Sequence, residues 1–83
     1  MSEIESLKFD IIKNFGTPCA VVDLNVLEAN ITRVQKLCDK AGVSNRPHVK
    51  THKSGEIARM QVNAGASGIT CQKLGEAEVM ANA

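Results

Sequence analysis

The sequence is short of aromatic residues, with two phenylalanines and no tryptophan or tyrosine among 83 residues. It also has no excess of either charge, because ten Lys and Arg residues against nine Asp and Glu residues leave a net charge of +1. Nucleic-acid binders usually carry a strongly basic surface, and those that bind single strands stack bases on aromatic rings. Both shortages argue against a nucleic-acid partner.

Long apolar runs are absent as well. No run approaches the roughly 20 apolar residues that a membrane-crossing helix needs, so we expect no membrane partner. The cysteines Cys19, Cys38 and Cys71 are odd in number and widely spaced, and no signal-like segment precedes them. We therefore expect reduced thiols and a cytoplasmic protein.

Four segments have the apolar spacing of a helix. The first is a lead-in helix within residues 1–16, which ends at Gly16. The second begins at a cap, Asp23 or Asn25, and ends at Gly42. The third follows Ser54 as its cap and closes on Gly65, and the fourth spans residues 74–83. The positions expected to pack are Leu27, Ile31, Val34, Cys38 and Ala41, then Ile57, Ala58, Met60, Gln61 and Ala64, then Ala77, Val79, Met80 and Ala81.

Three short, mainly apolar segments precede the last three helices: residues 19–22, part of residues 43–50, and residues 68–71. Alternating strands and helices predict an α/β fold with parallel strands. The predicted fold is an N-terminal helix plus about three βα units of a TIM-type (β/α)8 barrel, which needs eight strands and ~250 residues. We expect residues 17–83 to be the first part of such a barrel domain, incomplete in this chain.

Residues 46–53 (RPHVKTHK) carry most of the reactive side chains. Strand alternation puts His48 and Lys50 on one face, with Lys50 at the carboxyl end of the second predicted strand, where a barrel has its active face. Desolvation and nearby positive charge there favour a neutral amine, which can form a Schiff base with an aldehyde. Judged by position alone, a lysine at a strand end is more often a solvated surface residue.

Several segments together resemble one family. They are residues 17–23 (TPCAVVD), 30–31 (NI), 46–53 (RPHVKTHK) and 74–78 (LGEAE). They are similar to the N-terminal region of the D-threonine aldolase and D-serine dehydratase-like enzymes, which have the alanine racemase type of pyridoxal phosphate barrel. The resemblance extends over residues 17–83, and the RPHVKTHK segment is its most specific part.

The resemblance implies a role for Lys50 as the Schiff-base residue that carries pyridoxal phosphate, with Lys53 in support. It implies a lyase acting on a D-β-hydroxy amino acid, with retro-aldol cleavage to glycine and an aldehyde. D-serine dehydratase-like elimination is an alternative. A further alternative is a truncated, non-catalytic fragment that associates with itself or another chain; for an enzyme we expect a homo-oligomer.

The same resemblance implies a divalent metal near the substrate hydroxyl. Its ligands, and the loops that hold the cofactor phosphate, come from later segments in the family, so we predict no metal ligand here. His48 and Thr70 are the further residues expected to contact the cofactor. A zinc site formed by His48, His52 and Cys71 is disfavoured, because Pro47 and the predicted strand prevent the helical geometry that a pair four residues apart needs.

Two other patterns have structural explanations. Gly65, Gly68 and Gly75 do not have the G-x-G-x-x-G spacing of a dinucleotide-binding loop, so we interpret them as turn residues. Glu76 and Glu78 open the last predicted helix, where negative charge complements the positive end of the helix dipole.

Overall fold

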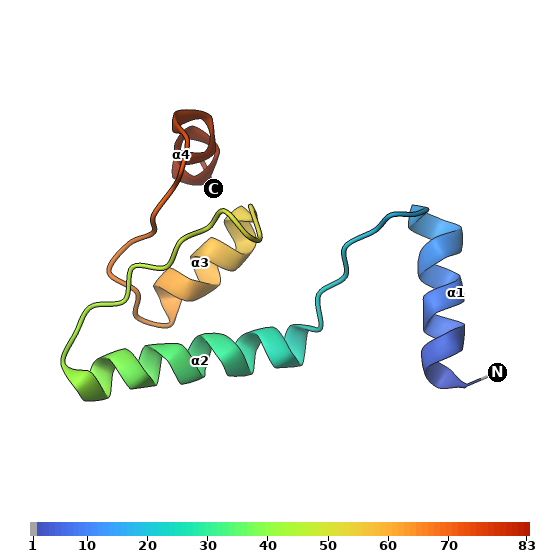
Figure 1. The fold of residues 1–83 in the computed structure, drawn as a ribbon, viewed down its shortest axis with the longest axis horizontal. Coiled ribbons are helices and arrows are strands. Elements are labelled where there is room, and N and C mark those ends of the chain that lie inside the picture. The colour runs from blue at the N-terminus through green and yellow to red at the C-terminus, as the bar shows by residue number, and fades with distance from the viewer. Residues whose placement is uncertain (1) are drawn as a thin grey trace.

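The computed structural model describes residues 2–83. Within these residues the chain forms α1 (Glu3–Phe15), α2 (Leu24–Ala41), α3 (Gly55–Asn63) and α4 (Leu74–Ala81). Helices α2, α3 and α4 gather at one end of the molecule, and α1 stands apart from them at the end of an extended connection (Figure 1). The molecule is elongated, with principal extents of 48 × 31 × 16 Å.

The helix termini follow the local chemistry of the sequence. The side chains of Asp23 and Ser54 accept the backbone N–H groups of Val26 and Ile57, both at 3.2 Å, which satisfies donors left free at the helix starts. At the end of α2, Gly42 has φ 72°, the left-handed conformation that glycine adopts without steric cost. The predicted starts at Asp23 and Ser54 and the predicted ends at Gly16 and Gly42 are confirmed.

The last two helices end slightly earlier than predicted. Helix α3 ends at Asn63, and Ala64 caps it in place of a longer run to Gly65. Helix α4 ends at Ala81, where the Asn82 side-chain Nδ2 donates to the Glu78 carbonyl at 3.0 Å.

The predicted strands are present only in part. Across residues 2–83 the β pairing amounts to one parallel bridge, between His48 and Thr70. The Thr70 N–H donates to the Pro47 carbonyl at 2.8 Å, and the Val49 N–H donates to the Thr70 carbonyl at 3.0 Å. The second and third predicted strand segments therefore lie side by side with the expected parallel direction, without forming a regular sheet.

The prediction of a first strand buried on both faces is wrong in this structure. Residues 19–22 lie in the extended connection between α1 and α2, and Val21 and Val22 remain 64% and 56% exposed (Figure 1). A strand needs a neighbour to bond its N–H and C=O groups, and none of the backbone hydrogen bonds within residues 2–83 joins residues 19–22 to another segment. An apolar run by itself therefore does not produce the strand.

A small core lies where the second and third strand segments meet α3 and α4. Val49 is fully buried, Ala58 of α3 and Met80 of α4 are nearly so, and Ile69 and Cys71 pack against them. The predicted packing roles of Ala58 and Met80 are confirmed. Val79, which was also expected to pack, is 64% exposed, so that prediction is wrong; the neighbouring Met80 takes the buried face of this short helix.

Helix α2 buries a polar residue that the apolar pattern did not indicate. Gln35 is only 5% exposed; its Nε2 donates to Asp39 Oδ1 at 2.9 Å, and its Oε1 accepts from Asn45 Nδ2 at 3.2 Å. Because both ends of the amide are hydrogen-bonded, its burial leaves no unpaired polar group. Val34, predicted to pack, is 41% exposed beside it.

Candidate functional site around Lys50

Lys50 directly follows the buried end of the second strand segment. Val49 is the last residue of the paired segment, and the Lys53 N–H donates to the Val49 carbonyl at 2.8 Å, which closes a turn over residues 49–53. The paired segment thus ends one residue earlier than predicted. Val49 is buried between exposed His48 and Lys50, as strand alternation predicts, whereas Thr51 is exposed because the turn has begun.

Lys53 adopts an uncommon backbone conformation in this turn. Its φ of 50° lies in the left-handed region, which side-chain-bearing residues seldom occupy. The Lys53 N–H bond to Val49 and the start of α3 immediately after Ser54 hold the turn on both sides. The turn therefore places Lys50 and Lys53 beside each other on the same rim.

The side chains of this turn line an open pocket of about 380 Å³ together with the start of α4. Its lining residues are Lys50, Thr51, Lys53, Gln72, Lys73 and Glu76. Three lysines and one glutamate thus line the pocket, a balance of charge that favours an anionic ligand. Glu76 Oε1 accepts the Gln72 N–H at 3.3 Å, which agrees with the structural role predicted for Glu76 at the opening of this helix.

His48 and Thr70, the other predicted cofactor contacts, face each other across the parallel bridge. Thr70 Oγ1 donates to the Arg46 carbonyl at 3.3 Å, so its hydroxyl is engaged with the backbone. His48 Nδ1 accepts the Lys50 N–H at 3.0 Å. Neither side chain is among those that line the pocket around Lys50, and their contact with a cofactor stays a prediction.

His52 is hydrogen-bonded within the fold. Its Nδ1 accepts the Ser54 N–H at 2.9 Å, and its Nε2 lies 3.2 Å from Gln61 Oε1. Cys71 is partly buried and packs against the apolar core. Residues 2–83 contain no group of three His, Cys, Asp or Glu side chains placed to hold a metal ion.

Gln72 and Lys73 are the pocket residues that the sequence interpretation missed. The signal that could have found them is strand register. His48 pairs with Thr70 in parallel, so continuing this register by two residues points from Lys50 to Gln72, and both residues line the pocket although the pairing itself ends at Val49. Lys73, which follows Gln72 and caps the start of α4, lines the same pocket.

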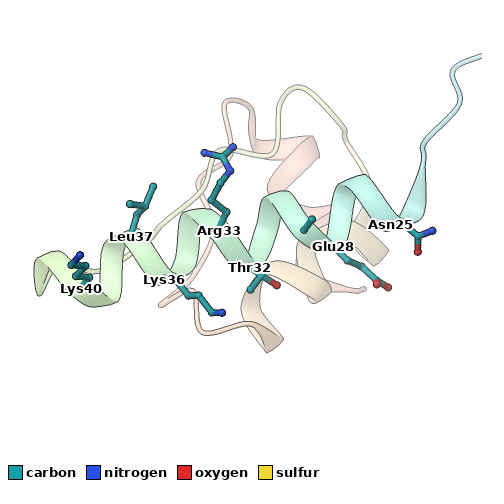
Figure 2. A pocket seen from close by; sticks show the side chains of 8 residues that line it. Asn25, Glu28, Thr32, Arg33, Lys36, Leu37 and Lys40 are labelled. Atoms are coloured by element: carbon teal, nitrogen blue, oxygen red, sulfur yellow. The ribbon is translucent and has the colours of Figure 1, made fainter.

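A larger hollow, of about 670 Å³, runs along the outside of α2 (Figure 2). Its lining side chains all come from that one helix, and Figure 2 shows them spreading outward from it. No second element brings polar groups toward them. We therefore regard this hollow as helix surface and the Lys50 pocket as the candidate site.

Known proteins resemble the chain over most of its length. No family model matches it. It is 51% identical over 69 residues to D-threo-3-hydroxyaspartate dehydratase from Delftia sp. (strain HT23), and 46% identical over 68 residues to D-threonine aldolase from Arthrobacter sp.. These matches cover 83% and 82% of this chain but 18% of each relative. The chain thus spans less than a fifth of the length of these curated relatives.

Solved structures give the same likeness. The crystal structure of D-threonine aldolase from Filomicrobium marinum matches 80% of this chain and 18% of its own, with a TM-score of 0.77 and 41% identity. A variant of D-threo-3-hydroxyaspartate dehydratase matches 98% of this chain and 22% of its own, with a TM-score of 0.79 and 40% identity. The chain is therefore homologous to part of the D-threonine aldolase and D-serine dehydratase-like enzymes, and the predicted resemblance is confirmed.

No helix within residues 2–83 combines the length and the apolar character that crossing a membrane requires.

Proposed function

We propose that this chain supplies the lysine-bearing part of a pyridoxal phosphate-dependent lyase that acts on D-β-hydroxy amino acids. The observation that carries the proposal is the placement of Lys50 on the rim of a cationic pocket, directly after the buried Val49. The relatives are named for D-threonine, D-serine and D-3-hydroxyaspartate, which share a D-configured α-carbon and a β-hydroxyl group.

The fold proposed for the working enzyme is a TIM-type barrel in which residues 17–83 form the first βα units, with residues 1–16 as a lead-in helix. The parallel pairing of His48 with Thr70, each segment followed by a helix, supports this arrangement. In the barrel, residues 19–22 would pair with the edge of residues 46–48 that faces away from Thr70.

The residues around Lys50 fit pyridoxal phosphate in two ways. First, the Lys50 side chain is exposed on the rim of the pocket, and the hydrogen bond to His48 uses only the backbone N–H of Lys50, so that bond leaves the side-chain amine available for the cofactor aldehyde. Second, Lys53 and Lys73 add positive charge beside Lys50, which complements an anionic cofactor. When bound, pyridoxal phosphate supplies an aldehyde for covalent attachment and a ring that withdraws electrons from the substrate α-carbon.

In this proposal the residues around Lys50 have defined tasks. Lys50 Nζ is the covalent attachment point, and Val49 anchors the backbone directly before it. The turn over residues 49–53 orients Lys50 and Lys53 toward one pocket. His48 and Thr70 stay proposed contacts at the edge of the site. We assign no metal ligand to this part of the enzyme, because the family resemblance places those ligands in later segments.

The proposed reaction is retro-aldol cleavage of the substrate to glycine and an aldehyde. Elimination of the β-hydroxyl group is the second candidate, because the relative that is 51% identical is a dehydratase. The residues described around Lys50 would serve both reactions, since both begin with the amino acid held by the same cofactor.

Selective labelling tests the role of Lys50. The 83-residue chain is mixed with pyridoxal phosphate and reduced with borohydride, and the modified lysines are mapped by peptide mass spectrometry. We expect the label on Lys50 to exceed that on any other lysine, including Lys53. Lys50→Ala should remove the dominant label, whereas Lys13→Ala in the exposed α1 should leave it unchanged. Equal labelling of all exposed lysines would contradict the proposal.

A further inference from the structure

We propose that His48 is a positioning residue for Lys50, and that it acts by holding the Lys50 peptide N–H on its ring nitrogen Nδ1. The inference rests on the proposed function of Lys50 and deepens it. It gives His48 a task that requires no contact with the cofactor.

The hydrogen bond fixes the protonation pattern of the ring. His48 Nδ1 lies 3.0 Å from the Lys50 nitrogen and accepts its hydrogen. An imidazole nitrogen that accepts has no hydrogen of its own, so in the neutral ring the hydrogen is on Nε2. The backbone on either side of His48 is held by the parallel bridge to Thr70, so the ring has a fixed base from which to reach Lys50.

The same contact occurs a second time four residues later. His52 Nδ1 accepts the N–H of Ser54, again two residues further along the chain, at 2.9 Å. Ser54 is the residue that caps α3, and its Oγ accepts the Ile57 N–H. Each histidine therefore holds the backbone two residues ahead: His48 holds the attachment lysine, and His52 holds the start of a helix. This accounts for the spacing of the two histidines without a shared metal ion.

Three hydrogen bonds restrain the backbone around Lys50. The Val49 N–H is bonded to Thr70, the Val49 carbonyl accepts from Lys53, and the Lys50 N–H is bonded to His48. The first bond restrains the chain before Lys50, and the second and third hold the carbonyl and the N–H of one planar peptide, the one between Val49 and Lys50. Loss of the imidazole would leave this peptide held by its carbonyl alone, so it could tilt about that remaining bond and the direction in which the Lys50 side chain leaves the chain would be less closely fixed.

Two substitutions at His48 separate this role from simple packing. His48→Ala removes the acceptor, whereas His48→Asn restores one, because an asparagine side-chain oxygen readily accepts the N–H two residues further along. His52→Ala is the matched control: it removes the equivalent contact at Ser54 and leaves the Lys50 N–H bonded. All three are made in the 83-residue chain.

NMR measures the exchange of the Lys50 amide hydrogen and the ring ¹⁵N shifts of His48, and mass spectrometry measures the pyridoxal phosphate label on each lysine. We expect the Lys50 amide hydrogen to exchange about five-fold faster in His48→Ala, at wild-type rate in His52→Ala, and near wild-type rate in His48→Asn. Ring ¹⁵N shifts of the wild-type chain should show Nδ1 of His48 without hydrogen. The ratio of pyridoxal phosphate label on Lys50 to label on Lys53 should fall about five-fold in His48→Ala and recover in His48→Asn.

Unchanged Lys50 exchange in His48→Ala, or a hydrogen on Nδ1 of His48, would overturn the positioning role. Failure of the proposed function looks different: the wild-type chain would then show protected Lys50 exchange and the expected ring shifts, but no preference of the label for Lys50.

Discussion

Val49 is the residue that fixes the position of Lys50, because it is fully buried and directly precedes it. Val49→Ala removes two methyl groups from the centre of the small core, which should lower the free energy of unfolding by about 2 kcal/mol. Val79→Ala is the matched control, since Val79 is 64% exposed and its truncation should change stability by less than about 0.5 kcal/mol. Urea denaturation followed by circular dichroism measures both. Equal effects of the two substitutions would show that the Val49 core is not formed in solution.

At the scale of single residues, the sequence predicted the exposed lysine at the end of a buried segment but missed its surroundings. The strand predicted within residues 43–50 placed Lys50 at its carboxyl end. The contacts of Gln72 and Lys73 with the pocket depend on the register between two segments more than twenty residues apart, which no local pattern determines. The bond from His48 to Lys50 depends on a turn that begins only at Val49.

At the scale of elements, two glycine substitutions should have opposite effects. Gly42 ends α2 with φ 72°, so Gly42→Ala should destabilise the chain by roughly 1 kcal/mol although no neighbouring atom obstructs a methyl group. Gly75, interpreted from the sequence as a turn residue, lies instead within α4, so that interpretation is wrong. Open space surrounds it, so Gly75→Ala should stabilise that helix by about 0.5–1 kcal/mol. Thermal unfolding by circular dichroism reports the sign of each. A stabilising Gly42→Ala would contradict the left-handed helix end.

Helices were predicted better than strands for a physical reason. The beginnings of α2 and α3 are set by Asp23 and Ser54, whose side chains bond N–H groups only three residues away. A strand depends on a partner elsewhere in the chain. Residues 68–71 find part of one in residues 46–49, while residues 19–22 find none, although their apolar run is the more continuous.

The whole molecule has more exposed surface than a compact domain of its size. Its radius of gyration is 15.7 Å, against about 12 Å for a compact domain of this length. Its accessible surface is 6588 Å², against about 4,800 Å² expected for its mass. Much of the excess is apolar: on α1, Ile4, Leu7 and Phe15 are 79%, 59% and 76% exposed.

We expect the isolated 83-residue chain to self-associate, because exposed apolar surface of this extent is seldom tolerated by a monomer in water. Sedimentation velocity should show species larger than 8.9 kDa whose proportion rises with concentration. Replacing Leu7 and Phe15 by lysine should reduce the association. Lys13→Gln is the control: it changes a polar residue of the same helix and should leave the association unchanged. A compact monomer with cooperative unfolding would refute this prediction.

The central claim, that this chain provides the attachment lysine of a D-β-hydroxy amino acid lyase, is tested most directly by exchange with a relative. The matching 68-residue segment of the Arthrobacter D-threonine aldolase is replaced by the corresponding residues of this chain, and cleavage of D-threonine to glycine is measured. The hybrid should cleave D-threonine in the presence of pyridoxal phosphate, and Lys50→Ala in the hybrid should abolish cleavage while Lys53→Ala leaves part of it. A folded hybrid that cleaves D-threonine equally well with and without Lys50 would contradict it.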